Sequence, residues 1–176
     1  AGMAGQPVVL RLQDKYHTWK DLRQIIPDML AAGLAGYPYT CPDMIGGGDY
    51  VSFQPGAELD EKLIVRSCQA HALMPMMQFS VAPWRVLSKE NMEICRKFAD
   101  LHKKFGPYIL ELARHASKTG EPIVRYMEYE FPNQGFEEVK DQFMLGSKYL
   151  VAPVLTEADE REVSLPAGEW KDDLGN

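Results

Sequence analysis

VVLRLQDKYHTW, residues Val8–Trp19, is the stretch of sequence that indicates the fold of this chain. It begins as a short, apolar, β-branched strand, which stops at the charged residues Arg11, Asp14 and Lys15. A predicted amphipathic helix follows directly. In α/β proteins the chemistry is placed where buried strands end, because the last side chains of those strands face the mouth of the site. We therefore expect functional side chains immediately after this strand.

Strands and helices alternate over the first part of the chain. After the opening strand, the predicted elements are the helix Trp19–Ala35, the strand Gly36–Cys41, the helix Leu59–Leu73, the strand Met74–Phe79 and the helix Lys89–Ser117. This order predicts an α/β fold with parallel strands joined by right-handed crossovers. Gly106 and Pro107 lie within the last helix and should kink or split it.

The pattern changes after Gly120. Four short strands with turns between them and no predicted helix follow, over Ile123–Tyr129, Gln142–Met144, Tyr149–Val154 and Glu162–Leu165. Such a series is typical of an antiparallel β module. We place the boundary near Thr119–Pro122, so that residues 1–120 form the α/β part and residues 121–176 form the β module.

Composition limits the partners of the chain. Its 176 residues carry a net charge of −6, and no basic stripe is present to replace the counterions of phosphate groups. We therefore expect neither a nucleic acid nor an anionic membrane as a partner. No stretch is long and apolar enough to span a membrane. Cys41, Cys68 and Cys95 show no metal-ligand spacing and are predicted to be buried thiols, so no metal or cofactor is expected.

Two aspartates follow two successive predicted strands. Asp14 is the first catalytic candidate, because a carboxylic acid can protonate a leaving oxygen and then take a proton from water. The alternative is that Asp14 only forms a salt bridge at the end of its strand. Asp43 suits a bidentate hydrogen bond to sugar hydroxyls, and its alternative role is an Asx turn into the loop Gly46–Gly48. That loop lacks the spacing of a phosphate-binding fingerprint.

Three further residues near strand ends are candidates for contact with a substrate. Trp19 and Trp84 can stack on the face of a pyranose ring, although packing is the alternative role, more so for Trp19 than for Trp84. Ser80 ends the third predicted strand and lacks the glycine context of a nucleophile elbow.

Five blocks of sequence, in one order, resemble a known family. They are RLQDKYHTW (11–19), GLAGYPYTCPDMIGGG (33–48), ALMPMMQFSVAPWR (72–85), EPIVRYMEYEFP (121–132) and DQFMLGSKYLVAPVLTEADEREVSLPAGEW (141–170). They cover nearly the whole chain and resemble glycoside hydrolase family 31. Its members are (β/α)8-barrel retaining α-glycosidases with a β-sandwich module after the barrel. The resemblance implies that residues 1–120 are the last three strand–helix units of the barrel and residues 121–176 the start of the β domain.

The resemblance also implies roles for single residues. Asp14 corresponds to the general acid/base, and Asp43 to the aspartate of the Asp-Ile-Gly-Gly loop that holds the sugar of the −1 subsite. Arg11 falls where many members carry an aromatic residue in the wall of the site. Ser80 stands where many α-glucosidases have a sugar-binding histidine, and Gly47 replaces the usual aromatic residue of the loop. Both departures fit a branch of the family associated with α-galactoside cleavage.

One element of a retaining glycosidase is not found. The mechanism needs a second carboxylate about 5–5.5 Å from the acid/base. In the family it lies in a tryptophan–x–aspartate–methionine motif on an earlier strand, and these residues contain no such motif. The expectation is a retaining α-glycosidase for a terminal α-linked hexose, a galactoside or a glucoside, in a chain that is inert without the missing N-terminal half of the barrel.

Two alternatives stay open at this point. The chain could belong to a non-catalytic carbohydrate-binding or regulatory homologue, which would keep the barrel without turnover. The chain could also belong to a barrel enzyme whose loop Gly46–Gly48 binds the phosphate group of its substrate. The net negative charge of the chain disfavours this alternative.

Overall fold

Two parallel strands and the helix that connects them form the first unit of the fold. The computed structural model describes residues 9–48 and 50–172, so Val8, the first residue of the predicted opening strand, lies outside the described part. β1 (Leu10–Arg11) pairs with β2 (Thr40–Cys41) in parallel, with Leu10 opposite Thr40 and Arg11 opposite Cys41. α1 (Trp19–Leu34) makes the crossover. The predicted parallel arrangement is confirmed, although both strands are shorter than predicted.

A third segment extends this parallel arrangement. Ile45 and Phe79 form an isolated parallel bridge, in which the Ile45 N–H donates to the Gln78 carbonyl (2.7 Å) and the Ser80 N–H to the Ile45 carbonyl (3.0 Å). The predicted strand Met74–Phe79 is thus present only as this bridge. One reason is that Pro75 has no N–H to donate to a neighbouring strand.

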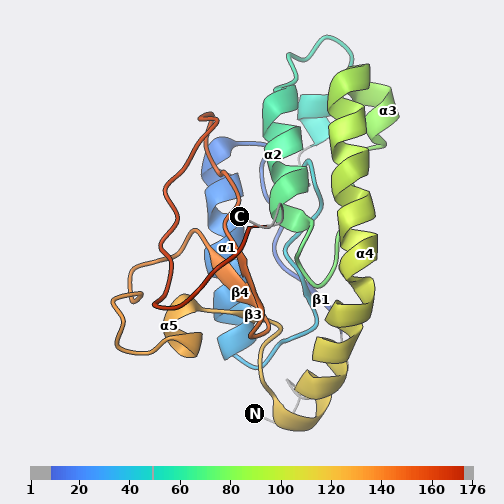
Figure 1. Cartoon of the computed structure of the whole chain (residues 1–176). Helices are drawn as coiled ribbons and strands as arrows, with labels where there is room; N and C mark the ends of the chain where they lie inside the picture. Colours follow the sequence, from blue (N-terminus) through green and yellow to red (C-terminus); the bar gives the residue numbers. More distant parts are fainter. Residues whose placement is uncertain (1–8, 49, 173–176) are drawn as a thin grey trace.

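The helices between β2 and β3 lie together on one side of the molecule (Figure 1). A short 3-10 helix, η1 (Tyr50–Phe53), precedes α2 (Glu61–His71), and α3 (Pro83–Val86) precedes the long α4 (Lys89–Thr119). α2 and α4 lie side by side. Side-chain oxygens cap both helices at the N-terminus: Asp60 accepts from the Leu63 N–H, and Ser88 from the Asn91 N–H.

α4 is a single helix of 31 residues that contains Pro107, so the predicted split at Gly106-Pro107 is wrong. The helix continues past the proline because Ile109, Leu112 and Ala116 are buried on its inner face. Tertiary packing of this apolar face outweighs the loss of one backbone hydrogen bond.

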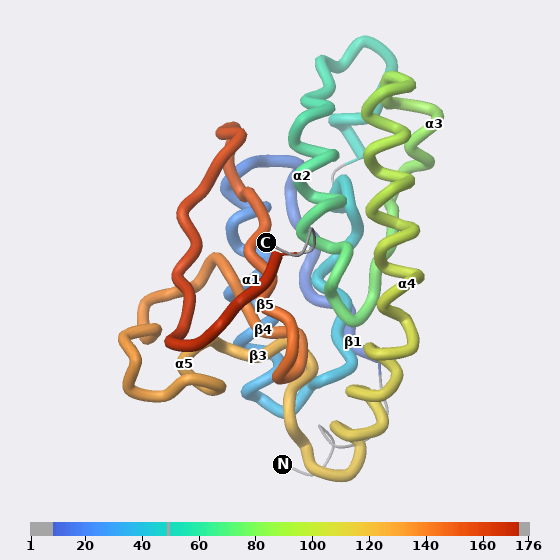
Figure 2. Tube along the Cα trace, viewed as in Figure 1, coloured from blue at the N-terminus to red at the C-terminus, as the bar shows by residue number. Residues whose placement is uncertain are grey.

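An antiparallel sheet follows α4, as predicted. β3 (Val124–Arg125) pairs with β4 (Phe143–Leu145), which pairs with β5 (Tyr149–Val151). Figure 2 shows the three strands next to one another, with the chain after β5 running on as an extended loop.

The predicted strands at the two ends of this module differ from the structure. Ile123–Tyr129 is not one strand, because a short helix, α5 (Met127–Glu130), begins after β3 and buries Met127 with Phe136. No strand forms at Glu162–Leu165. There the Gln142 side chain accepts from the Ser164 N–H (3.0 Å) and donates to the Ser164 carbonyl (2.7 Å), which occupies the groups that a strand partner would use.

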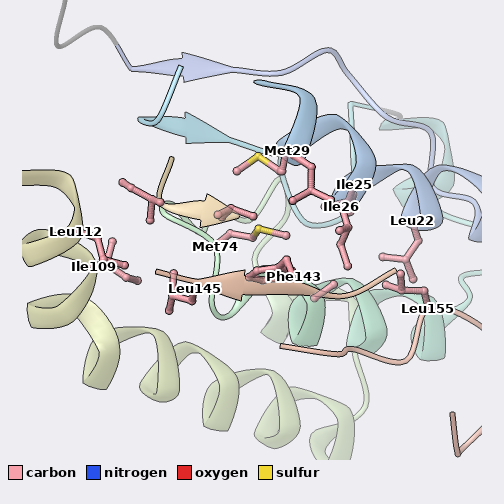
Figure 3. Packing of buried hydrophobic residues seen from close by; sticks show 14 of the residues in the cluster. Leu22, Ile25, Ile26, Met29, Met74, Ile109, Leu112, Phe143, Leu145 and Leu155 are labelled. Carbon is pink, nitrogen blue, oxygen red and sulfur yellow. The ribbon is translucent and has the colours of Figure 1, made fainter. Parts of the chain in front are cut away.

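One hydrophobic cluster joins the α/β part to the β module (Figure 3). Ile26 and Met29 of α1, Leu112 of α4, and Phe143 and Leu145 of β4 belong to it. The two parts of the chain therefore share a core. Over residues 9–48 and 50–172, no helix has the length and apolarity needed to cross a bilayer.

Candidate active site

Arg11 brings the two candidate aspartates together. It is the last residue of β1, and Asp14 and Asp43 follow the ends of the adjacent parallel strands β1 and β2. The same nitrogen, Nη1 of Arg11, contacts Oδ1 of Asp14 at 2.6 Å and donates to Oδ1 of Asp43. These hydrogen bonds, that of Asp14 first, raise the pKa of Arg11, which stays cationic. Two carboxylates and one guanidinium thus form a single cluster.

The two carboxyl groups differ sharply in exposure. The Asp43 side chain has 0% of its surface exposed, whereas that of Asp14 has 64%. The second oxygen of Asp43 accepts from the backbone N–H of Lys15 at 2.7 Å. Asp43 therefore fixes the chain around Arg11 and Lys15, and Asp14 is the carboxyl group that an incoming molecule meets first.

The backbone at Asp43 is strained. Its φ is +124°, a region that side chains other than glycine rarely adopt. Asparagine and aspartate tolerate positive φ better than other residues do. Such strain persists only where surrounding contacts impose it, and it concentrates at functional sites. The hydrogen bonds from Arg11 and Lys15 supply those contacts here.

The glycine loop packs directly on the segment that carries Asp14. A Cβ at Gly48 would lie 2.7 Å from Cγ of Asp14, and a Cβ at Gly47 would overlap the carbonyl oxygen of Lys15. The Gly48 N–H donates to that same carbonyl at 3.0 Å. Side chains at these two positions would push the loop away from Asp14, so the glycines allow the close approach.

Lys15 and Cys41 support the cluster from inside. Nζ of Lys15, a side chain only 7% exposed, binds Oδ2 of Asp28 in α1 at 2.7 Å. Sγ of Cys41 donates to the backbone oxygen of Asp43 at 3.4 Å. Burial raises the pKa of the Cys41 thiol, so it stays neutral and acts as a donor rather than a nucleophile. All three cysteines are buried, as predicted.

The other predicted site residues lie at different distances from this cluster. Ser80 backs the glycine loop, because its Oγ donates to the Ile45 carbonyl at 2.9 Å. Trp19 is held by Asp60, whose Oδ2 accepts from Nε1 at 2.9 Å, and it packs against the core. Trp84 is 74% exposed on α3. The structure thus brings Arg11, Asp14, Asp43 and Ser80 to one region and gives Trp19 a packing contact.

A pocket of about 680 Å³, here called the η1 pocket, adjoins the cluster. Its lining includes Gly47, Gly48, Tyr50, Phe53, Ser80 and Arg85. Sequence reasoning did not select Tyr50, Phe53 or Arg85 as site residues. Nothing in their local pattern distinguishes them, because they come from η1 and α3, and only the fold places these elements beside the glycine loop.

His71 is fully buried in α2. Its Nδ1 lies 2.7 Å from the Ser67 carbonyl, and Nε2 has no hydrogen-bond partner among the described residues. Burial lowers the pKa of His71 below its ordinary value of 6.5. The folded protein therefore holds this histidine neutral where the unfolded chain takes up a proton.

We expect this difference to make folding sensitive to acid. Because the unfolded state binds the proton more readily, the free energy of unfolding should fall as the pH drops below about 6.5. Urea unfolding of the intact protein at about pH 7.5 and about pH 5.5 measures the change. His71→Gln should reduce it. An equal pH dependence in the variant and the wild type would contradict the assignment to His71.

No group of three or more histidine, cysteine, aspartate or glutamate side chains in the described part of the chain could hold a metal ion. What the Arg11 cluster offers is an exposed carboxyl group next to a cation and a buried carboxylate. Such a set can exchange protons with a bound molecule and hydrogen-bond its hydroxyl groups.

Comparison with known proteins assigns the family. The model of the glycosyl hydrolases family 31 TIM-barrel domain matches residues 1–112, and that of the glycosyl hydrolase family 31 C-terminal domain matches residues 120–174. The chain belongs to glycoside hydrolase family 31. The α/β architecture of part of a TIM barrel followed by an antiparallel β domain is thereby confirmed.

The chain is also similar to individual glycosidases. The myogenesis-regulating glycosidase of Mus musculus is 39% identical over 171 residues, which is 92% of this chain and 24% of the relative. An α-glucosidase of Saccharolobus solfataricus is 30% identical over 166 residues, 89% of this chain and 23% of the relative. The chain thus spans about a quarter of the length of the curated relatives it matches.

Among solved structures, a GH31 dextranase of Flavobacterium johnsoniae complexed with glucose superposes with a TM-score of 0.76. It is 32% identical, and the match covers 89% of this chain and 20% of the dextranase chain.

Proposed function

We propose that the protein is a retaining α-glycosidase that removes a terminal α-linked hexose, an α-galactoside or an α-glucoside. The main observation behind the proposal is that Asp14 and Asp43 both contact Nη1 of Arg11. All three residues lie at or just after the carboxyl ends of parallel strands. Catalytic groups of TIM-barrel enzymes occupy this end of the barrel. Membership of a glycosidase family supports the same conclusion.

In this mechanism Asp14 is the general acid and then the general base. Its carboxyl group is exposed and so can reach the glycosidic oxygen, protonate it, and later take a proton from the attacking water. Loss of the proton to the leaving oxygen restores a carboxylate beside the Arg11 cation. Arg11 thereby stabilises the charge that Asp14 carries between the two steps.

Arg11 and Asp43 bind the sugar hydroxyls as a pair. The Arg11 side chain is 40% exposed and donates to hydroxyl oxygens, while the fully buried Asp43 orients the guanidinium and so supports sugar binding through Arg11. Ser80 adds a hydroxyl on the glycine-loop side. Trp84 remains a candidate for stacking on a sugar face, since 74% of its surface is free.

The second carboxylate of the retaining mechanism belongs, in this proposal, to an earlier barrel strand that is not among these 176 residues. A partner half-barrel must therefore supply the nucleophile about 5–5.5 Å from Asp14. These residues alone are expected not to turn over an aryl α-glycoside.

The stereochemistry of the product tests the proposal. With the intact protein and an aryl α-galactoside or aryl α-glucoside, the first sugar released should be the α-anomer, before mutarotation. Proton NMR of the anomeric signal during the first minutes gives the answer. Release of the β-anomer would contradict the retaining mechanism.

A non-catalytic carbohydrate-binding homologue is the second candidate. The contact between Arg11 and Asp14 favours it, because the guanidinium occupies Oδ1 of Asp14, one of the two oxygens that a general acid could direct at the glycosidic oxygen. Sugar binding by the intact protein without turnover of either aryl α-glycoside would favour this candidate over the enzyme.

A further inference from the structure

The η1 pocket adjoins the Asp14 carboxyl group through the glycine loop. Gly47 and Gly48 form part of its lining, and Gly48 is the residue that packs against the Asp14 carboxyl group. A general acid protonates the oxygen of the leaving group, so the leaving group occupies space next to that acid. The pocket of about 680 Å³ is in the size range of small-molecule sites.

The walls of the η1 pocket are mainly apolar. Phe53, Leu59, Val81 and Val86 contribute side chains, and Tyr50, which is 73% exposed, adds an aromatic face. Phe53 is held in place on one side by the ring of His17, with centroids 5.6 Å apart. Such walls favour a flat apolar or aromatic group over a highly hydrated one.

One cation stands in this apolar lining. Among the described residues that line the η1 pocket, Arg85 alone is charged, and it forms no ion pair within residues 9–48 and 50–172. The other cations near the site are engaged: Arg11 binds Asp14 and Asp43, and Lys15 binds Asp28.

Glu61, the first residue of α2, is also engaged elsewhere. Oε2 of Glu61 accepts from the N–H and the hydroxyl of Ser88, both at 2.9 Å, and from the amide of Asn91 at 2.6 Å. These hydrogen bonds lower the pKa of Glu61, and they tie it to the start of α4. Among the residues that the structure describes, no carboxylate is paired with Arg85 at the pocket.

We propose that the η1 pocket binds the leaving group of the substrate, and that this group is an apolar or aromatic unit carrying a negative charge, which Arg85 binds. The inference rests on the proposed function, and it adds the class of substrate: an α-glycoside of an acidic aglycone. A guanidinium pairs with a carboxylate or a sulfonate through parallel N–H donors. Arg85 is an exposed residue of the pocket lining, so its guanidinium is accessible to a bound group.

Binding of the isolated leaving group tests the inference without turnover. The probes are 4-hydroxyphenylacetate and its neutral amide, 4-hydroxyphenylacetamide, measured by titration calorimetry on the intact protein. We expect the wild type to prefer the acid by about tenfold, the order of one charge-assisted hydrogen bond. Arg85→Gln should abolish this preference. Arg114→Gln, at an exposed arginine of α4 outside the pocket, should keep it.

A kinetic measurement places the pocket on the leaving-group side. The α-glycosides of the same two phenols should differ in kcat/KM by about tenfold in the wild type and in Arg114→Gln, and not in Arg85→Gln. Equal binding of acid and amide by the wild type, or an unchanged preference in Arg85→Gln, would overturn the inference.

The two proposals can fail separately. If no aryl glycoside is hydrolysed, the proposed function fails, and the binding preference alone still supports or overturns the assignment of Arg85. If both glycosides are hydrolysed at equal rates by the wild type, the glycosidase proposal holds and the acidic leaving group is wrong.

Discussion

Asp14→Asn is expected to lower kcat of the intact protein on an α-glycoside with a poor leaving group by about 10²- to 10⁴-fold. The amide cannot protonate the glycosidic oxygen and cannot take a proton from water. On an aryl α-glycoside with an acidic phenol the first step needs little protonation, so the glycosyl-enzyme should accumulate. Azide attacks this intermediate without a base, and it should restore turnover with an α-glycosyl azide as the product.

Stability separates this effect from a folding defect. The Asp14 side chain is 64% exposed, and an exposed ion pair contributes little to folding, so the unfolding midpoint of Asp14→Asn should stay close to that of the wild type. Asp159→Asn is the matched control, because Asp159 is an exposed, ion-paired aspartate far along the chain. Full activity of Asp14→Asn on an α-glycoside with a poor leaving group would contradict the acid/base role of Asp14. No effect of azide on the turnover of the aryl α-glycoside would contradict it as well.

Asp43→Asn should impair both substrate binding and folding. The carboxylate is buried and accepts from the Arg11 guanidinium and the Lys15 N–H, and the variant replaces one charged oxygen by an amide that must donate. Loss of a hydrogen bond to a charged group costs about 2–3 kcal/mol, so kcat/KM should fall at least about 30-fold. Urea unfolding should show a loss of stability of about the same size.

Asparagine is chosen as the replacement so that the variant adds little backbone strain at position 43. Asparagine tolerates positive φ better than alanine does, so at the φ of +124° Asp43→Ala should lose more stability than Asp43→Asn. Asp141→Asn, at an exposed aspartate paired with Arg161 in the β module, should leave kcat/KM unchanged. Wild-type kcat/KM in Asp43→Asn would show that this carboxylate does not support sugar binding.

The site could be predicted in part because it follows strand ends. Arg11, Asp14 and Asp43 stand directly after short apolar runs, and parallel strands place such residues at one edge of the sheet. The bridging position of Arg11 was not predictable. Arg11 and Asp43 are 32 positions apart, and their contact depends on the register of β1 against β2 and on the side-chain conformation of the arginine.

The errors in the fold have the same origin. Gly106-Pro107 favours a break by local propensity, yet α4 continues because its apolar face is buried. Glu162–Leu165 alternates as a strand does, yet the Gln142 side chain takes the backbone groups of Ser164. The local sequence pattern indicates only which secondary structure an isolated segment prefers. Burial and long-range hydrogen bonds then decide between the competing conformations.

The amino-acid sequence by itself determined the alternation of strands and long helices over residues 1–120 and the residue types at the strand ends, because periodicity and turn residues act over a few neighbouring positions. Only the tertiary structure decided that Asp43 is buried while Asp14 is exposed, and that Tyr50, Phe53 and Arg85 line a pocket beside them. Exposure and proximity depend on which distant segments pack together, and no local pattern encodes those contacts.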